Sequence, residues 1–491
     1  MHSIFDLFQL IASNIWLYGG AFIVVLSILV FVHEWGHYIV AVKNGVKIDS
    51  FSIGFGKELF GYTDQRGTRW KFSLIPLGGY VKMFGDVDPA SASHSEEVKD
   101  EDSEEMRPLT EEEKKVAFFN KSVGARAAIV FAGPAINFLF AIVLMAGLFI
   151  FVGEPVTPAV AGAVIADSPA YQAKFQPHDV ILSIDGVKIR RFEDIRREVM
   201  IALDTPLTFT VQRDGKELQI VTTPEKHEEE DRFGFKHSYG LLGIISQGNA
   251  INTDKIAEID GVQYDDPEKV RQVLSARMGQ VMRITLADSA PAPTDAENAD
   301  ETKDDDTAST VDEKTPSEDE NDTFIIRPLV DANKAMNDPN SDDFGLLYIG
   351  DGETQTLLKH TVVSGVLEAF HETYMISAST LEAIGQMFTG TRSATELGGL
   401  IRIGAIAGDM AKSGLIALIS FTALLSINLG LINLFPIPML DGGHLVFYGI
   451  EAVRGAPLSE QVQEYAFRAG LAVLVALMLF ANLNDIVQIL M

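Results

Sequence analysis

The sequence predicts a polytopic α-helical membrane protein with four transmembrane helices, a membrane-associated β-hairpin and two extracytoplasmic α+β domains. Three observations carry this prediction: long uncharged apolar segments, a stretch rich in glycine and aromatic residues, and an α+β pattern that occurs twice. The predicted parts of the 491-residue chain are the first transmembrane helix (1–50), the β-hairpin (51–85), an acidic cytoplasmic insertion with a basic flank (86–126), the second transmembrane helix (127–152), the two α+β domains (158–226 and 238–330), interfacial amphipathic helices (360–411), and the third and fourth transmembrane helices (412–444 and 465–491).

Four segments carry no charged residue, namely 16–32, 127–152, 413–440 and 469–484. A hydrocarbon core of about 30 Å takes roughly 20 helical residues, so the second and third segments can span it alone and the other two span it with their flanks. No Lys or Arg precedes Lys43, which argues against a signal peptide and for a first helix that stays in the mature protein.

The distribution of basic residues predicts the orientation in the membrane. Residues 43–126 contain thirteen Lys and Arg, whereas 1–15 and 153–173 contain none. Because basic loops stay in the cytoplasm, we expect 43–126 there and both termini, with the long region 153–412, on the outer side.

Residues 51–85 favour strands over helix. Trp70, Phe72 and Leu74 alternate with polar residues, and "GYTDQRG" is typical of a turn. Such a hairpin lies at membrane depth only where protein or a water-filled cavity satisfies its backbone.

The outer region contains an internal repeat. The tripeptide "IDG" occurs at 184–186 and 259–261, a period of about 75 residues, and a helix and a strand are predicted after each copy. The second copy is interrupted by 288–322 before its last strand, 323–330.

Much of the net charge of −29 comes from two acidic segments. Residues 86–113 have twelve Asp and Glu against two basic residues, and 288–322 have fourteen against two. Segments of this composition are predicted to be disordered, although an acidic docking tail is an alternative. Nothing in the sequence indicates nucleic-acid binding, and the absence of cysteine excludes disulfides and thiolate chemistry.

The motif HEWGH predicts a zinc site. On a helix, His33 and His37 lie one turn apart on one face, so both imidazoles can bind one Zn²⁺ while Glu34 takes a proton from water. A charged side chain at mid-bilayer costs about 2.5–3.5 kcal/mol, so these residues indicate function rather than packing.

A third protein ligand is expected, and two residues qualify. Asp441 follows 28 uncharged residues at the inner end of the third span, where the first span also delivers its histidines; His444 is the alternative. Pro436 and Pro438 are expected to break the helix before Asp441, and Gly442 and Gly443 to let backbone approach the metal. Asn433 could hydrogen-bond a substrate carbonyl, or pack helices instead.

Three motifs together resemble the site-2 protease family of intramembrane zinc metalloproteases: HEWGH, "FAGPAINF" at 132–138 (with the preceding Phe131) and "NLFPIPMLDGG" at 433–443. The resemblance implies that His33, His37 and Asp441 bind Zn²⁺, that Glu34 is the general base and that Asn433 contacts the substrate. It implies that both outer domains are PDZ-like and that 51–85 re-enters the membrane.

The same resemblance implies a place in the cell and a class of substrate. It places the chain in a bacterial inner membrane, with the active site near the cytoplasmic side. The expected substrates are single-span membrane proteins trimmed by a first-site protease, such as an anti-sigma factor in an envelope stress response, or remnant signal peptides. The PDZ-like domains would exclude untrimmed substrates.

Two other classes of protein compete with this interpretation. A proton- or metal-coupled transporter could use the same intramembrane groups, but four spans without a repeated membrane half argue against it. A scaffold with a vestigial site is the second alternative, against which Glu34 is intact beside both histidines.

Overall fold

The computed structural model describes residues 2–85, 97–99, 106–231, 233–287, 323–351 and 356–490. The insertion 288–322 and most of the acidic stretch 86–113, for which disorder is predicted, lie outside the described residues.

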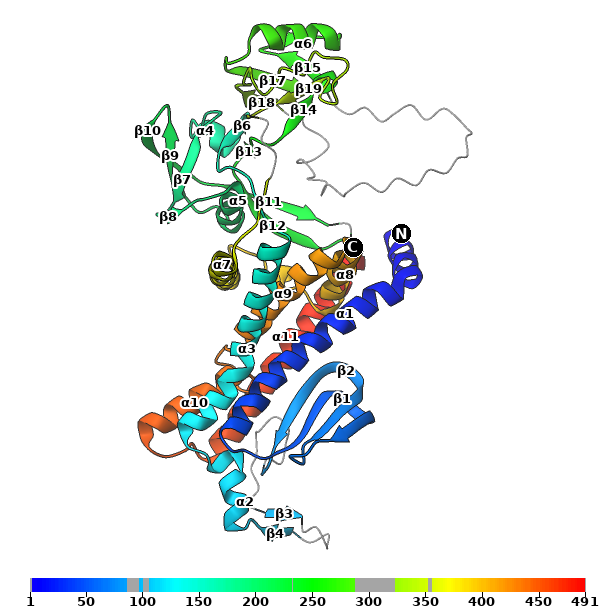
Figure 1. Ribbon diagram of the computed structural model, residues 1–491, viewed down its shortest axis with the longest axis vertical. Coiled ribbons are helices and arrows are strands. Elements are labelled where there is room, and N and C mark those ends of the chain that lie inside the picture. Colours follow the sequence, from blue (N-terminus) through cyan, green and yellow to red (C-terminus); the bar gives the residue numbers. More distant parts are fainter. Residues whose placement is uncertain are drawn as a thin grey trace.

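Four helices in the described part of the chain are long and apolar enough to cross a membrane, as the sequence predicts. They are α1 (His2–Lys43, apolar from Leu17), α3 (Val123–Phe151), α9 (Leu415–Asn433) and α11 (Glu460–Leu490). Figure 1 shows them as one bundle, with the α+β units beyond one end and the hairpin beside α1 towards the other. Both chain ends lie on the side of the α+β units (Figure 1).

The third predicted span, 412–444, is one helix, a break and the start of another. After α9 ends at Asn433, residues 434–440 are not helical, and α10 (Asp441–Arg454) then begins. Pro436 and Pro438 cause the predicted break, because each lacks an N–H and disfavours helix at the preceding residue. The continuation of α10 beyond 444 was not predicted. It packs on α3, where an Arg126–Glu451 ion pair of 2.6 Å joins the two helices.

The predicted hairpin consists of β1 (Ile48–Thr63) and β2 (Arg69–Met83). Both strands bend, so that Phe51 of β1 lies opposite two residues of β2, Val81 and Trp70. The hairpin therefore forms a small sheet of four extended segments, which lie side by side in the order 58–63, 69–73, 50–53 and 79–83. The Phe51 and Trp70 rings stack at 4.5 Å, and Tyr38 of α1 meets Trp70 at 5.1 Å. This aromatic group fixes the sheet against α1, next to the HEWGH motif.

The two α+β units repeat the same turn. In the first unit Asp185 donates its N–H to Thr208 and its carboxylate accepts the N–H of Thr208. Asp260 makes the same pair of bonds with Arg283 in the second unit. A ten-residue helix follows each turn, so the internal repeat is confirmed: α5 (Phe192–Ile201) in the first unit and α6 (Pro267–Ala276) in the second.

The boundary between the units differs from the predicted one. The first unit has a four-stranded sheet in the order β10-β9-β7-β8, and the second a six-stranded sheet in the order β13-β6-β18-β17-β15-β16. The strand β6, which the prediction placed within 158–226, pairs with β18 and β13, so its backbone bonds join it to the second unit. Its side chains still enter both hydrophobic cores. The strands of these sheets are β6 (Ala161–Ile165), β7 (Val180–Ile184), β8 (Val187–Lys188), β9 (Leu207–Arg213), β10 (Lys216–Thr222), β13 (Ile244–Ser246), β15 (Ile256–Ile259), β16 (Val262–Gln263), β17 (Met282–Leu286) and β18 (Thr323–Ile326).

Short elements connect these parts. Besides the hairpin, four strand pairs in the described part of the chain lie outside the two sheets: β3 with β4, β11 with β12, β14 with β19, and β5, directly after α3, with β20. Their bounds are β3 (Glu97–Lys99), β4 (Met106–Pro108), β5 (Glu154–Val156), β11 (Glu225–Glu230), β12 (Lys236–Leu241), β14 (Ala250–Asn252), β19 (Leu346–Tyr348) and β20 (Thr356–Leu358); the short helices are α2 (Glu111–Val116) and α4 (Pro169–Gln172).

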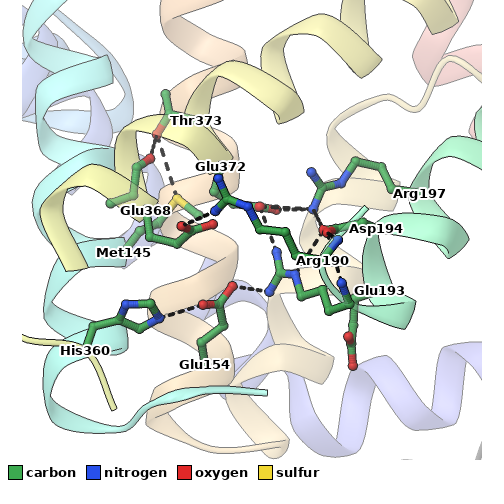
Figure 2. Close-up of polar contacts among 12 residues, drawn as sticks. Met145, Glu154, Arg190, Glu193, Asp194, Arg197, His360, Glu368, Glu372 and Thr373 are labelled. Atoms are coloured by element: carbon green, nitrogen blue, oxygen red, sulfur yellow. Dashed lines mark hydrogen bonds and ion pairs between the residues drawn. The ribbon is translucent and has the colours of Figure 1, made fainter. Parts of the chain in front are cut away.

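The region 360–411 forms two helices, α7 (Val362–Thr389) and α8 (Leu400–Lys412). A charge cluster docks the first unit on α7. Arg191 binds Glu154, Asp194 and Glu372, with 3.0 Å to each of the latter two. Arg197 reaches Glu372 at 2.8 Å and His360 reaches Glu154 at 2.7 Å (Figure 2). We call these six residues the charge cluster. They connect α5 and β5 with α7 and with His360, which lies just before α7.

Candidate metal centre

Three side chains from two distant parts of the chain converge inside the bundle. The Nε2 atoms of His33 and His37 lie 3.2 Å apart. One carboxylate oxygen of Asp441, Oδ2, is 3.2 Å from Nε2 of His33, and the other, Oδ1, is 3.6 Å from Nε2 of His37. These three residues are the only group of this kind among the described residues, and we call them the metal cluster.

The spacing of the donor atoms is compatible with a zinc ion. Zinc bonds to nitrogen and oxygen are about 2.0–2.1 Å long, so neighbouring ligand atoms around it lie roughly 3.3 Å apart. The two nitrogens are 3.2 Å apart, and each carboxylate oxygen lies close to one of them, Oδ2 at 3.2 Å from His33 and Oδ1 at 3.6 Å from His37. A fourth position then stays open, as in catalytic zinc sites.

The hydrogen bonds around the cluster also favour a cation. The Nδ1 atom of His37 is 2.9 Å from the carbonyl oxygen of Ile129, which can only accept a hydrogen bond. That nitrogen therefore carries the proton, and Nε2 presents a lone pair to the cluster. Oδ2 of Asp441 is buried and has no hydrogen-bond partner. The two Nε2 atoms lie within hydrogen-bonding distance of each other, with roles that depend on the tautomer of His33. The unpaired carboxylate oxygen is costly to bury, and a bound cation would compensate it.

The loop before α10 positions Asp441. A methyl group at Gly442 would lie 2.3 Å from the carbonyl oxygens of Leu434 and Phe435, and one at Gly443 would lie 2.4 Å from that of Ile437. These glycines therefore admit the backbone of the preceding loop, rather than bringing backbone to the metal as predicted. Met439 has a φ of 88°, a left-handed conformation that a non-glycine residue adopts under constraint. The tight packing holds Asp441 in the first turn of α10.

Helix α3 approaches the ligands very closely. A methyl group at Gly133 would lie 2.3 Å from Nε2 of His37 and 2.9 Å from Cε1 of His33, while one at Gly36 would lie 2.4 Å from the carbonyl oxygen of Ala132. Small residues allow two membrane helices to pack backbone to backbone. Here they leave room for the two imidazoles between α1 and α3.

Sequence reasoning missed the contact of Asn137 with the metal cluster. Its amide lies 3.1 Å from Nδ1 of His33, and the residue is fully buried. A signal existed, because Asn137 is the one polar side chain in the uncharged segment 127–152. Polar residues in such segments mark functional contacts or helix packing.

Glu34 lies beside the hairpin. Its carboxylate is within hydrogen-bonding reach of the backbone of Val81, and a methyl group at Gly79 would lie 3.4 Å from its Cγ. The segment 79–83 of β2 thus runs next to the predicted base, which couples the hairpin to the metal cluster.

The two remaining predicted residues lie in different surroundings. Asn433 is the last residue of α9 and is half-buried. Its side chain makes no hydrogen bond to the described part of the chain. The ring of His444 packs against Phe467 at 5.1 Å and Tyr448 at 6.4 Å, and His444 is not a member of the metal cluster. Of the two candidates for the third ligand, the geometry favours Asp441.

Membrane-spanning helices around a His₂Asp cluster with an adjacent glutamate define an intramembrane metalloprotease. Comparison with known proteins gives the same result. The sequence pattern of "Peptidase family M50" matches residues 21–477. "Putative zinc metalloprotease Atu1380" of Agrobacterium fabrum is 36% identical over 465 residues, which covers 95% of this chain and 94% of that protein. "Regulator of sigma-E protease RseP" of Salmonella typhimurium is 32% identical over 498 residues, covering 95% and 97%.

The chain therefore belongs to peptidase family M50. It is a zinc metalloendopeptidase of the site-2 protease type, which confirms the family, the enzyme class and the Zn²⁺ cofactor predicted from the sequence.

Proposed function

We propose that this enzyme hydrolyses peptide bonds in or beside the transmembrane segments of single-span membrane proteins that a first-site protease has already trimmed. The observation that carries the proposal is the convergence of His33, His37 and Asp441 within the bundle of spanning helices. The name of the Salmonella relative, a regulator of sigma-E protease, supports an anti-sigma factor as a substrate; remnant signal peptides are a second class.

Each residue of the site has a proposed role in this reaction. Zinc held by His33, His37 and Asp441 would supply Lewis acidity to the scissile carbonyl and to water. Glu34 takes the proton of the attacking water and returns it to the leaving amide nitrogen, so that a C–O bond forms as the C–N bond breaks. The unpaired amide of Asn433 donates a hydrogen bond to the substrate carbonyl and to the oxyanion that develops from it.

The hairpin is proposed to present the substrate. Helical peptide bonds are shielded by their own hydrogen bonds, so the substrate must be extended before it is cut. Segment 79–83 pairs with 50–53 on one edge, and its other edge approaches Glu34 through Val81. An extended substrate added to this edge as a further strand would lie beside the base.

We propose a bacterial inner-membrane location with both termini in the periplasm and the metal cluster near the cytoplasmic side. Both chain ends lie with the α+β units, opposite the hairpin (Figure 1), and the basic loop 43–126 belongs to the hairpin end. The chain has no cysteine, so single cysteines introduced at either end can be tested with a membrane-impermeant thiol reagent. Labelling of terminal cysteines only from the cytoplasm would refute this orientation.

The two α+β units are proposed to be PDZ-like domains that exclude bulky, untrimmed substrates. They stand beyond the end of the bundle from which an outer domain of a substrate would approach (Figure 1). Removal of 158–330 should therefore allow cleavage of intact substrates; if these stay uncut in a folded deletion variant, the filter role is wrong.

The decisive experiment replaces Glu34 by Gln in the full chain, reconstituted with a model single-span substrate. We expect E34Q to keep zinc and to lose cleavage by a factor of about 10²–10⁴, because general base catalysis is removed while the ligands stay. Zinc content and cleavage are measured on the same sample, and a chelator should abolish cleavage by the unchanged enzyme. Glu112→Gln, which alters an exposed carboxylate of α2, is the matched control. Cleavage by E34Q at the normal rate would contradict the proposal.

A further inference from the structure

One face of α3 lies against both histidines of the metal cluster. Residues 129, 133 and 137 are spaced by four, so they share a face of the helix, and they face His33 and His37, which are also spaced by four on α1. Gly133 provides the room, and the residues on either side of it provide a polar atom for each ring: the carbonyl oxygen of Ile129 for His37 and the amide of Asn137 for His33.

The partner of the outer nitrogen decides which tautomer a histidine adopts. For His37 the carbonyl of Ile129 fixes the proton on Nδ1 and leaves Nε2 free to bind metal. For His33 the partner is an amide, which can either donate or accept. If the NH₂ group of Asn137 donates to Nδ1, the proton of His33 sits on Nε2 and no lone pair faces the cluster.

An unpaired amide oxygen and an occupied lone pair argue against that donating arrangement. With Nδ2 of Asn137 directed at His33, the amide oxygen is buried without a partner. In that arrangement the Nε2 proton of His33 would point to Nε2 of His37, 3.2 Å away, and would occupy the lone pair that the metal needs. A half-turn of the amide, which exchanges its O and N, gives the amide oxygen the Nδ1 proton and frees Nε2 for the metal.

We propose that Asn137 is a positioning residue that holds His33 in the zinc-binding tautomer, its amide oxygen accepting the Nδ1 proton. The inference rests on the zinc ligands proposed above and adds an outer residue to them. Partners of this kind orient the ring, and their loss typically weakens metal binding by 10- to 100-fold.

The backbone of Asn137 is itself fixed. The hydroxyl of Ser426 in α9 donates to the carbonyl oxygen of Asn137 at 2.8 Å, and both residues are fully buried. The main chain of Asn137 is therefore held in place, and the rotation of its side-chain amide decides whether the amide donates or accepts.

The test compares two replacements of Asn137 that have nearly the same size. Asn137→Asp offers only acceptors to His33, and Asn137→Leu offers nothing. Zinc affinity of the full chain in detergent is measured by competition with a chromophoric chelator, and the visible spectrum of the cobalt-substituted protein reports the ligand geometry. We expect N137L to bind zinc 10- to 100-fold more weakly and N137D to bind within about tenfold of the unchanged protein. Thr422→Val, which removes a buried hydroxyl bonded within α9 alone, is the control and should leave the affinity unchanged.

Each outcome decides the inference. Unchanged zinc affinity in N137L, or equal weakening in N137L and N137D, would overturn it, the latter because an acceptor would then not suffice. Should N137L not fold, Asn137→Val carries the same comparison. His33→Ala distinguishes the two levels of the argument: zinc retained in H33A refutes the proposed ligands, whereas zinc lost in H33A but kept in N137L refutes only the role of Asn137.

Discussion

Two buried polar groups lie along α3, and they differ in how their charges are balanced. The charge cluster, directly after the helix, contains both signs: Arg191 alone meets three carboxylates. Burial by itself would lower the pKa of Arg191, but the carboxylates of Glu154 and Glu372 raise it. The metal cluster, beside the helix, consists of two imidazoles and one carboxylate without a Lys or Arg, and Oδ2 of Asp441 has no hydrogen-bond partner.

This difference separates a structural group from a functional one. Buried charges that neutralise one another hold parts of a protein together, and the charge cluster ties the first α+β unit to α7 (Figure 2). A buried group of acceptors is incomplete until a cation binds, so its side chains have to be held in place by their surroundings. Helix α3 supplies that support, through Gly133 and through polar atoms behind both rings.

The largest effect is expected from Gly133→Ala. The added methyl would lie 2.3 Å from Nε2 of His37, closer than any real contact, so the ring must move away from the cluster. We expect zinc content and cleavage to fall below about a tenth of normal, since overpacking shifts side chains and backbone. Zinc is measured by atomic absorption on the purified protein. Gly147→Ala in the same helix, where nothing lies within 4 Å, should change neither quantity. Normal zinc binding by G133A would show that α3 does not support the ligands.

The sequence predicted that the side chains of the metal cluster would lie close together, but not their surroundings. The pair His33 and His37 follows from the helical period, and the length of the uncharged segment favoured Asp441 as the third member, with His444 as the alternative. The prolines at 436 and 438 predicted a break, yet nothing local indicated that α10 continues beyond 444. The pairing of β6 with β18 and the partners of Arg191 depend on residues far apart in the chain. Such contacts are set by tertiary packing, which periodicity does not encode. Asn137 stood out only as a polar residue in an apolar segment.

An intermediate effect, confined to the outer part of the molecule, is expected from Arg191→Met. It leaves Glu154, which is 3% exposed, without its arginine, and removal of one partner from a buried ion pair costs about 3–5 kcal/mol. The midpoint of thermal unfolding should fall and proteolysis of the first unit should accelerate, while zinc content stays normal. The neighbouring Arg190→Met is the control, because that side chain is 57% exposed and its pair with Glu368 is worth about 0–1 kcal/mol. Loss of zinc in R191M would mean that the two clusters are not independent.

The smallest effect concerns a mismatch within the same docking interface. Burial raises the pKa of Glu198 in α5, and the carboxylate of Glu382 in α7 raises it further, against the lowering effect of Arg197. Burial likewise raises the pKa of Glu382. A carboxyl group with a raised pKa in the folded state binds its proton more tightly there than in the unfolded state. Docking is therefore penalised above that pKa, and the penalty is relieved as the pH falls through it.

Glu198→Gln tests this mismatch because it removes one of the two charges. The variant should unfold at a slightly higher temperature than the unchanged protein at pH 7, with the difference shrinking towards pH 4.5, as followed by thermal unfolding across that range. Glu112→Gln in α2, outside the interface, should show no such pH-dependent difference. A gain that is constant with pH would assign the effect to packing and not to charge. A loss would mean that the arginines of the charge cluster already neutralise Glu198, and that this interface, unlike the metal cluster, contains no uncompensated charge.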